Sequence, residues 1–225
     1  MNKQTRKVML WLLDLGINIV IIFLLVIVIQ KWVIAPFDVS GASMCNTLNF
    51  INEECEEGYG EKIVINEAGY FFGEPERGDI VVFSVPEQKT EDDEDKYFIK
   101  RVVGLPGETI ELKDGEVFIT KKNGEKSIKI DEYYLKKKNK GKTVDHYGMK
   151  VFQVPENYYF VLGDNRNNST DSRSCFNNSN CTLEKAFISK ESIRGRAWFV
   201  WWPLKSIRGL NKLDYPELEE SLEEK

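Results

Sequence analysis

The sequence predicts a mainly β protein, built on an antiparallel sheet and preceded by one transmembrane helix at the N-terminus. Two observations predict this fold class. Residues 8–29 are almost entirely apolar, whereas the chain beyond residue 50 consists of short runs of β-branched and aromatic residues separated by turn residues. About 180 residues lie outside the apolar segment and an acidic C-terminal tail, enough for one domain with its own core or for a core with a small subdomain.

The apolar segment divides the chain into a cytoplasmic N-terminus, residues 1–7, and a transmembrane anchor, residues 8–34. Spanning a bilayer takes about 20 helical residues, so the length fits. Lys3, Arg6 and Lys7 precede the segment, and Lys31 is the single basic residue between it and Asp38. By the positive-inside rule we expect a single pass through the plasma membrane, with the N-terminus in the cytoplasm and the following domain outside.

A cleaved signal peptide is the alternative interpretation of this segment. The apolar core of a signal peptide is normally about 7–15 residues long, shorter than this run. Val33-Ile34-Ala35 resembles a cleavable tripeptide, but Pro36 follows it, and the tertiary amide before a proline is a poor peptidase substrate. We therefore expect an anchor that stays uncleaved.

Residues 35–212 are expected to form the extracytoplasmic domain. Its β-type runs read KIVI, DIVVFSV, YFIKRVVG, TIELKDGEVFIT, YYFVLG and GRAWFVWW. The Asp114-Gly115 pair lies between two alternating runs, which is a strong signal for a β-hairpin. Residues 213–225 are acidic and are expected to form a frayed tail.

The composition excludes several kinds of chemistry. The net charge is −5, so nucleic acid is not an expected partner, because phosphate binding needs a concentrated basic face. The chain has one histidine, His146, and neither an HExxH motif nor paired CxxC motifs, so no metal site is expected. No phosphate-binding glycine motif appears, and no organic cofactor is expected. If the protein is an enzyme, its base is expected to be a residue other than histidine.

A lysine can serve as that base for a serine nucleophile, provided that burial lowers the pKa of its amine by several units. Lys100 lies on a predicted strand between Ile99 and Val102-Val103, and strand alternation turns it away from Ile99 and Arg101. A lysine on a half-buried strand is more often an exposed charge. In the same way, the serines and glycine of SGAS, residues 40–43, are ordinary turn residues when taken alone.

Four segments in order are similar to the motifs of bacterial type I signal peptidases, the membrane-tethered Ser/Lys proteases that remove signal peptides. APFDVSGASMCNTL, residues 35–48, resembles the nucleophile motif of that family. RGDIVVF, residues 77–83, resembles the strand that follows it, and KRVVGLPGE, residues 100–108, resembles the lysine motif. VPENYYFVLGDNRNNSTDSR, residues 154–173, resembles the last motif. The resemblance implies an antiparallel sheet of signal-peptidase type with a small cap subdomain.

The resemblance also assigns expected roles to individual residues. It implies that Ser43 is the nucleophile, that Lys100 is the general base and that the Ser169 hydroxyl holds the base in place. The oxyanion hole would use the Ser43 backbone N–H, with Gly41 where some members supply a serine hydroxyl. The remaining expectation is a structural ion pair near the site between Asp171 and Arg173.

The chain departs from the family pattern at two features. Asn46 replaces the proline of the usual Ser-Met-x-Pro-Thr sequence, which removes a fixed φ from the nucleophile loop. Four cysteines in an extracytoplasmic domain suggest disulfides, and three pairings are possible. We favour Cys45–Cys55 with Cys175–Cys181, and a cross-link between the two loops is the alternative.

The predicted function is removal of N-terminal signal peptides from secretory precursor proteins after a small-x-small motif. One alternative is a maturation peptidase dedicated to a single client, and another is a non-catalytic membrane protein that binds signal peptides. The three tryptophans of AWFVWW, Trp198, Trp201 and Trp202, are candidates for contact with membrane lipid. Strand alternation predicts that some of them face the core instead.

Overall fold

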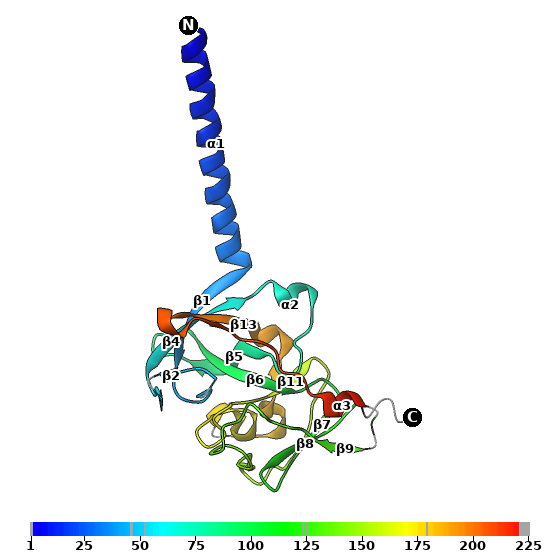
Figure 1. Cartoon of the computed structure of the whole chain (residues 1–225). Coiled ribbons are helices and arrows are strands. Elements are labelled where there is room, and N and C mark those ends of the chain that lie inside the picture. The colour runs from blue at the N-terminus through cyan, green and yellow to red at the C-terminus, as the bar shows by residue number, and fades with distance from the viewer. Residues whose placement is uncertain are drawn as a thin grey trace.

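The computed structural model describes residues 2–45, 47–51, 53–122, 124, 126–178 and 180–220. Helix α1 (Lys3–Trp32) extends away from the rest of the chain as a long rod (Figure 1). Within it, Gln4–Ile29 contains an 18-residue window with a mean hydropathy of 3.0, and among the described residues it is the one helix long and apolar enough to cross a membrane. The structure therefore agrees with a single candidate span. Ile34 already pairs with Asn66, so the first strand begins inside the segment assigned to the anchor.

The main sheet is antiparallel throughout and lies beneath α1 (Figure 1). Its strand order is β1-β4-β13-β5-β6-β11-β12, and β14 pairs with β13. The bounds are β1 (Ile34–Ser40), β4 (Tyr59–Asn66), β5 (Ile80–Lys89), β6 (Asp95–Gly104), β11 (Tyr158–Leu162), β12 (Ile188–Ser189), β13 (Ile193–Trp202) and β14 (Arg208–Gly209). The predicted mainly β, antiparallel fold is confirmed.

A second, four-stranded sheet forms the cap subdomain on the side away from α1 (Figure 1). Its order is β10 (Val151–Gln153), β7 (Thr109–Lys113), β8 (Glu116–Thr120) and β9 (Ser127–Lys129). Asp114 and Gly115 join β7 to β8, both with positive φ, as the sequence predicts for a two-residue hairpin turn. A Cβ on Gly115 would lie 2.1 Å from the Gly141 carbonyl oxygen, so this turn requires glycine.

Short elements complete the chain. The strands β2 (Phe50–Ile51) and β3 (Glu54–Cys55) form a small hairpin after the nucleophile motif. The other elements are the helices α2 (Gly69–Phe72) and α3 (Pro216–Glu220) and the 3₁₀ helices η1 (Ser172–Asn177), η2 (Leu183–Ala186), η3 (Lys190–Ser192) and η4 (Leu204–Ser206).

The acidic C-terminal segment is packed rather than frayed as far as the structure describes it. Tyr215 and Leu218 are only 5% and 3% exposed, and both belong to the core cluster between the cap sheet and β11. The expectation of a frayed tail was wrong for these residues. Tyr215, just before α3, and Leu218, within it, lie three positions apart and are both buried, whereas Glu219 is exposed, and the acidic composition hides that pattern.

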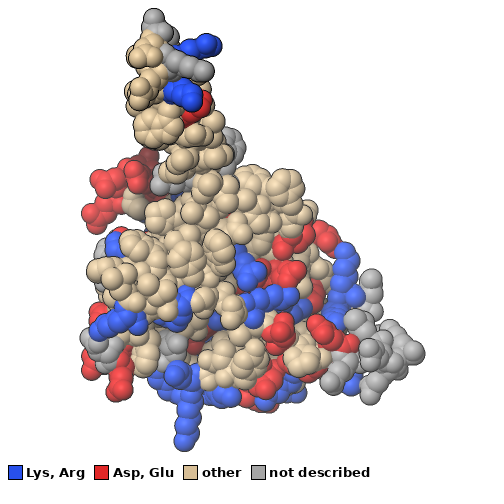
Figure 2. Space-filling model, turned by 45° about the horizontal axis from the view of Figure 1, so that its top comes forward, with Lys and Arg blue, Asp and Glu red and all other residues tan. Residues whose placement is uncertain are grey.

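The three tryptophans of β13 are all exposed: Trp198 by 54%, Trp201 by 36% and Trp202 by 44%. The expectation that some of them face the core was wrong. The pairing register of β13 with β4 shifts between Ala197 and Phe199 and again between Val200 and Trp202. Such irregularities break the alternation of side chains, so Trp201 and Trp202 are both exposed. A broad surface beside α1 carries few charged side chains (Figure 2).

Candidate active site

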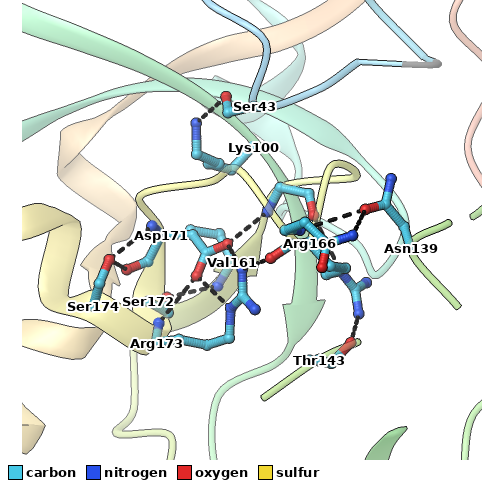
Figure 3. A network of polar contacts seen from close by, with 12 residues as sticks. Ser43, Lys100, Asn139, Thr143, Val161, Arg166, Asp171, Ser172, Arg173 and Ser174 are labelled. Carbon is cyan, nitrogen blue, oxygen red and sulfur yellow. Dashed lines mark hydrogen bonds and ion pairs between the residues drawn. The ribbon is translucent and has the colours of Figure 1, made fainter. Parts of the chain in front are cut away.

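Ser43 and Lys100, 57 residues apart in the sequence, form a direct contact. Ser43 lies in the turn that follows β1, and Lys100 lies on β6 opposite Val81 of β5. The Lys100 Nζ is 2.7 Å from the Ser43 Oγ and 2.8 Å from the Ile99 carbonyl oxygen. The two side chains point toward each other (Figure 3). An amine at this distance can accept the proton of the serine hydroxyl when it is neutral.

The surroundings of Lys100 favour the neutral amine. Its side chain is only 3% exposed, and burial lowers the pKa of Lys100 to about 8. The charges of Asp171 and Asp164 act in the opposite direction and raise the pKa. The pKa reflects burial partly offset by two carboxylates.

Asp164 joins the nucleophile loop to the strand of Lys100. Its carboxylate accepts two hydrogen bonds from the buried Arg101 guanidinium, of 2.9 and 2.6 Å, and a third of 2.5 Å from the Thr47 hydroxyl. Asn165 adds two more contacts to the loop, from its N–H to the Ser43 carbonyl and from its side chain to the Ala42 carbonyl. Sequence reasoning did not single out these residues, although Arg101, Asp164 and Asn165 lie within the quoted motifs.

Asn49 holds the other side of the nucleophile loop. Its side-chain amide donates to the carbonyls of Val39 and Gly41, both at 3.1 Å, and its oxygen accepts the Glu61 N–H at 2.7 Å. The side chain is fully buried, and the backbone has a φ of 55°, which asparagine tolerates better than most residues. No pattern in the sequence points to Asn49.

Arg166 connects the last motif to the cap subdomain (Figure 3). Its guanidinium donates to the Gly163 carbonyl at 3.0 Å and pairs with the buried Glu132 carboxylate, and it also contacts the Thr143 hydroxyl. A buried ion pair that loses one partner is strongly destabilising, so this network fixes the loop that carries Asn165 and Ser169.

A groove of about 1160 Å³ runs beside the Ser43–Lys100 pair. One wall is β1 with the loop that follows it, and the other is the segment of β6 from Asp95 to Lys100. Ile63, Val82 and Ile99 contribute apolar surface. β1 is an edge strand, and β11 pairs with β6 only from Arg101 to Gly104, so among the described residues both walls have a strand edge without a partner.

Residues 12–202 match the family model described as "Signal peptidase, peptidase S26". The chain belongs to this family. It is 35% identical to Signal peptidase I S of Bacillus subtilis (strain 168), with 86% of this chain and 90% of that protein covered. It is 30% identical to Signal peptidase IB of Staphylococcus aureus (strain COL), with 90% of this chain and 94% of that protein covered. Membership confirms the predicted family and identifies the chain as a serine endopeptidase, a hydrolase.

A solved signal peptidase I from Enterococcus faecalis V583 is also similar. It is 32% identical with a TM-score of 0.39, and the match covers 55% of this chain and 97% of that one.

In this signal peptidase family member, Asp171 and Arg173 form a bidentate ion pair with both distances at 2.9 Å. Neither side chain is exposed. Burial alone would raise the pKa of Asp171, but the charge and hydrogen bonds of Arg173, with the Gly163 N–H, outweigh it and lower the pKa to about 2. The contact is the ion pair that the family resemblance implies.

Ser169 lies beside the Ser43–Lys100 pair without a hydrogen bond to Lys100. A Cβ on Gly163 would be 2.1 Å from the Ser169 Oγ and 2.6 Å from the Ser43 carbonyl oxygen, so the two serines meet across this glycine. The Ser169 Oγ is buried and has no hydrogen-bond partner among the described residues. The contact with Lys100 that the resemblance implies is not formed in this structure.

Gly41 has a φ of +83° and donates its N–H to the Gly58 carbonyl at 3.1 Å. A Cβ at this position would have nothing within 4 Å, so a side chain here would have open space beside the groove. The Ser43 N–H has no acceptor among the residues that the structure describes. Of the two residues expected at the oxyanion hole, only Ser43 has a free amide.

Of the two departures from the family pattern, the structure describes the cysteines. Asn46 falls outside the described residues. Cys45 is bonded to Cys55, with the Cα atoms 5.6 Å apart, and Cys175 is bonded to Cys181, with the Cα atoms 5.3 Å apart. This is the pairing that the sequence favours, and the alternative cross-link between the two loops is not formed. One bond ties the nucleophile loop to β3, and the other closes the loop after η1.

Proposed function

We propose that this chain is a membrane-bound endopeptidase that removes N-terminal signal peptides from secretory precursor proteins, with Ser43 as nucleophile and Lys100 as general base. The observation that carries the proposal is the 2.7 Å contact between the Lys100 Nζ and the Ser43 Oγ, made by a lysine whose pKa burial lowers to about 8. A lysine on a solvent-exposed face would be an ammonium at neutral pH and could not accept the proton.

The reaction follows from this contact. Neutral Lys100 takes the hydroxyl proton as the Ser43 Oγ attacks the scissile carbonyl, and the free Ser43 N–H stabilises the oxyanion. The resulting ammonium gives its proton to the leaving amine, which releases the mature protein and leaves an acyl-enzyme. Lys100, neutral again, then activates a water that hydrolyses the ester. Burial of the lysine and the contacts of Asp164 and Asn165 to the loop keep the reacting groups in place.

The groove supports an extended substrate. An extended peptide could pair with the free edges of β1 and β6 at once. In an extended chain, alternate residues point to the same face, so the first and third residues before the scissile bond would both face the apolar surface of Ile63, Val82 and Ile99. Limited room at that wall would select small side chains, which gives the small-x-small motif.

The membrane places enzyme and substrate side by side. Basic residues before α1 favour a cytoplasmic N-terminus, so the catalytic domain faces outward, where translocated precursors emerge. Trp198, Trp201 and Trp202 are exposed on β13, and a surface beside the helix carries few charged side chains (Figure 2). Exposed aromatic side chains prefer the membrane interface, and we assign these three to contact with lipid.

The test is cleavage of labelled precursors by the full chain in detergent or in vesicles, with the products identified by mass spectrometry. Wild-type protein should cut several unrelated precursors after small-x-small, and Ser43→Ala should cut none. As a matched control, Lys129→Met, on an exposed strand of the cap, should behave as wild type. Cleavage of a single precursor would favour the dedicated maturation peptidase, and binding without cleavage would favour the non-catalytic protein.

A further inference from the structure

The groove continues past Ser43 to a carboxylate that the mechanism does not use. Glu57 lines the groove together with Ser43. The Gly41 N–H bonds to the Gly58 carbonyl, which places Glu57 beside the loop that leads into Ser43. The Asn168 side-chain amide donates to the Glu57 Oε1 at 3.3 Å. The segment between β3 and β4 therefore meets the segment 154–173 at this end of the groove.

The direction of the groove relative to the membrane decides which part of a substrate reaches Glu57. β1 begins at Ile34, directly after α1, and ends at Ser40, three residues before Ser43. The β6 segment from Asp95 to Lys100 runs in the same direction as β1, because the rings of Phe37 and Tyr97 meet at 5.4 Å and Lys100 contacts Ser43. A signal peptide held in the membrane therefore lies along the α1 side. The first residues of the mature protein lie beyond Ser43, on the side of Glu57.

The charge of Glu57 is not neutralised by a nearby cation. Elsewhere in the groove, Asp38 pairs with Lys62 and Asp95 pairs with Lys89. Glu57 has a neutral amide as its hydrogen-bond partner, and among the described residues no lysine or arginine nitrogen lies within 4 Å of it. Lys138 contacts the Cys55 Sγ at 3.5 Å instead.

We propose that Glu57 is a specificity-determining residue that favours cationic, and disfavours acidic, side chains in the first three residues after the scissile bond. The inference rests on the proposed function, because it takes Ser43 as the point of cleavage. Opposite charges about 6 Å apart in largely aqueous surroundings change a rate or binding constant about threefold. Replacing a favourable lysine by an unfavourable glutamate therefore should change kcat/KM about tenfold or more at low ionic strength.

The experiment compares three precursors that are identical up to the cleavage site and carry Lys, Gln or Glu at the second residue after it. The kcat/KM ratio of the Lys to the Glu substrate is measured with the full-length enzyme at low and at high salt. Wild type should give a ratio of about ten, reduced at high salt by screening. Glu57→Gln should bring the ratio close to one, and Glu57→Lys should invert it.

Glu54→Gln is the matched control, because Glu54 is an exposed carboxylate on β3, three residues before Glu57, and does not line the groove. It should leave the wild-type ratio unchanged. Thermal unfolding of each variant checks that it is folded. A ratio near one in wild type, or a ratio that Glu57→Gln does not change, would overturn the role of Glu57. Failure of wild type to cleave even the Gln substrate would instead overturn the proposed function.

Discussion

The Thr47 hydroxyl donates a hydrogen bond of 2.5 Å to the carboxylate of Asp164, a residue 117 positions later in the chain. The same carboxylate holds Arg101, the neighbour of Lys100 on β6. One buried side chain therefore sets the position of the nucleophile loop relative to the strand of the base. The first prediction concerns this hydrogen bond.

Thr47→Val should reduce kcat by roughly tenfold, with a smaller change in KM, because the loop that carries Ser43 loses a fixed contact while the groove is kept. It should also lower the free energy of unfolding by about 1.5–3 kcal/mol, as expected for a hydrogen bond to a charged group. Steady-state kinetics and denaturant unfolding measure the two effects. Thr120→Val, in the cap sheet, should change neither, and an unchanged kcat in Thr47→Val would mean that the loop is positioned without Asp164.

The activity should depend on the protonation of Lys100. Its pKa is about 8, and the ammonium form cannot accept a proton, so kcat/KM should be low at pH 6 and rise tenfold per unit until it levels off above pH 8. A pH profile of kcat/KM with a neutral substrate measures this. A profile that is flat between pH 6 and 9 would contradict a lysine base.

Lys100→Met should abolish cleavage and leave the protein at least as stable as wild type at pH 7. The pKa of Lys100 is about 8 when folded against a model value of 10.5, so burying the amine costs about 3 kcal/mol at pH 7. Between pH 8 and pH 10.5, Lys100 is protonated more often in the unfolded chain than in the folded one. The stability of wild type therefore rises with pH through this window.

Lys100→Met should lack this rise, which denaturant unfolding at pH 7, 9 and 10.5 would measure. Lys100→Arg should be as inactive as Lys100→Met, because guanidinium does not release its proton in this range. Substantial cleavage by either variant, in protein free of host signal peptidase, would contradict the mechanism.

The Cys45–Cys55 bond should matter more for activity than Cys175–Cys181. Cys45 lies two residues from Ser43 and is fully buried, whereas the second bond closes a loop of a few residues after η1. The double variant Cys45→Ser/Cys55→Ser should lose about 2–3 kcal/mol of stability and much of kcat. Cys175→Ser/Cys181→Ser should lose less of both. Peptide mapping under non-reducing conditions should find both bonds, and four alkylatable thiols in fresh protein would rule them out.

The catalytic domain should face outward on an intact anchor. Protease added to spheroplasts should degrade the domain, because the basic residues before α1 keep the N-terminus inside. N-terminal sequencing of the purified protein should recover the start of the chain. A mature protein that begins at Pro36, or a domain that resists protease until the membrane is lysed, would contradict this topology.

Much of the fold was predictable because it depends on local pattern. The apolar run that forms α1, the alternating runs that form the strands and the Asp114-Gly115 turn each follow from the preferences of neighbouring residues. The same local motifs, in order, identify Ser43 and Lys100 as candidates. Alternation failed at Trp201 and Trp202, where shifts of strand register, set by pairing with β4, expose both side chains.

The sequence by itself determined which residue types were available: a lysine on an apolar strand, two serines in a glycine-containing turn and an acidic segment that includes apolar residues. Only the tertiary structure decided that Lys100 reaches Ser43, that Asn49 and Asp164 hold the loop between them, and that Tyr215 and Leu218 enter the core. The physical reason is distance along the chain. These contacts join segments separated by many residues, and the pKa of Lys100 depends on the burial and the two carboxylates that such contacts bring together.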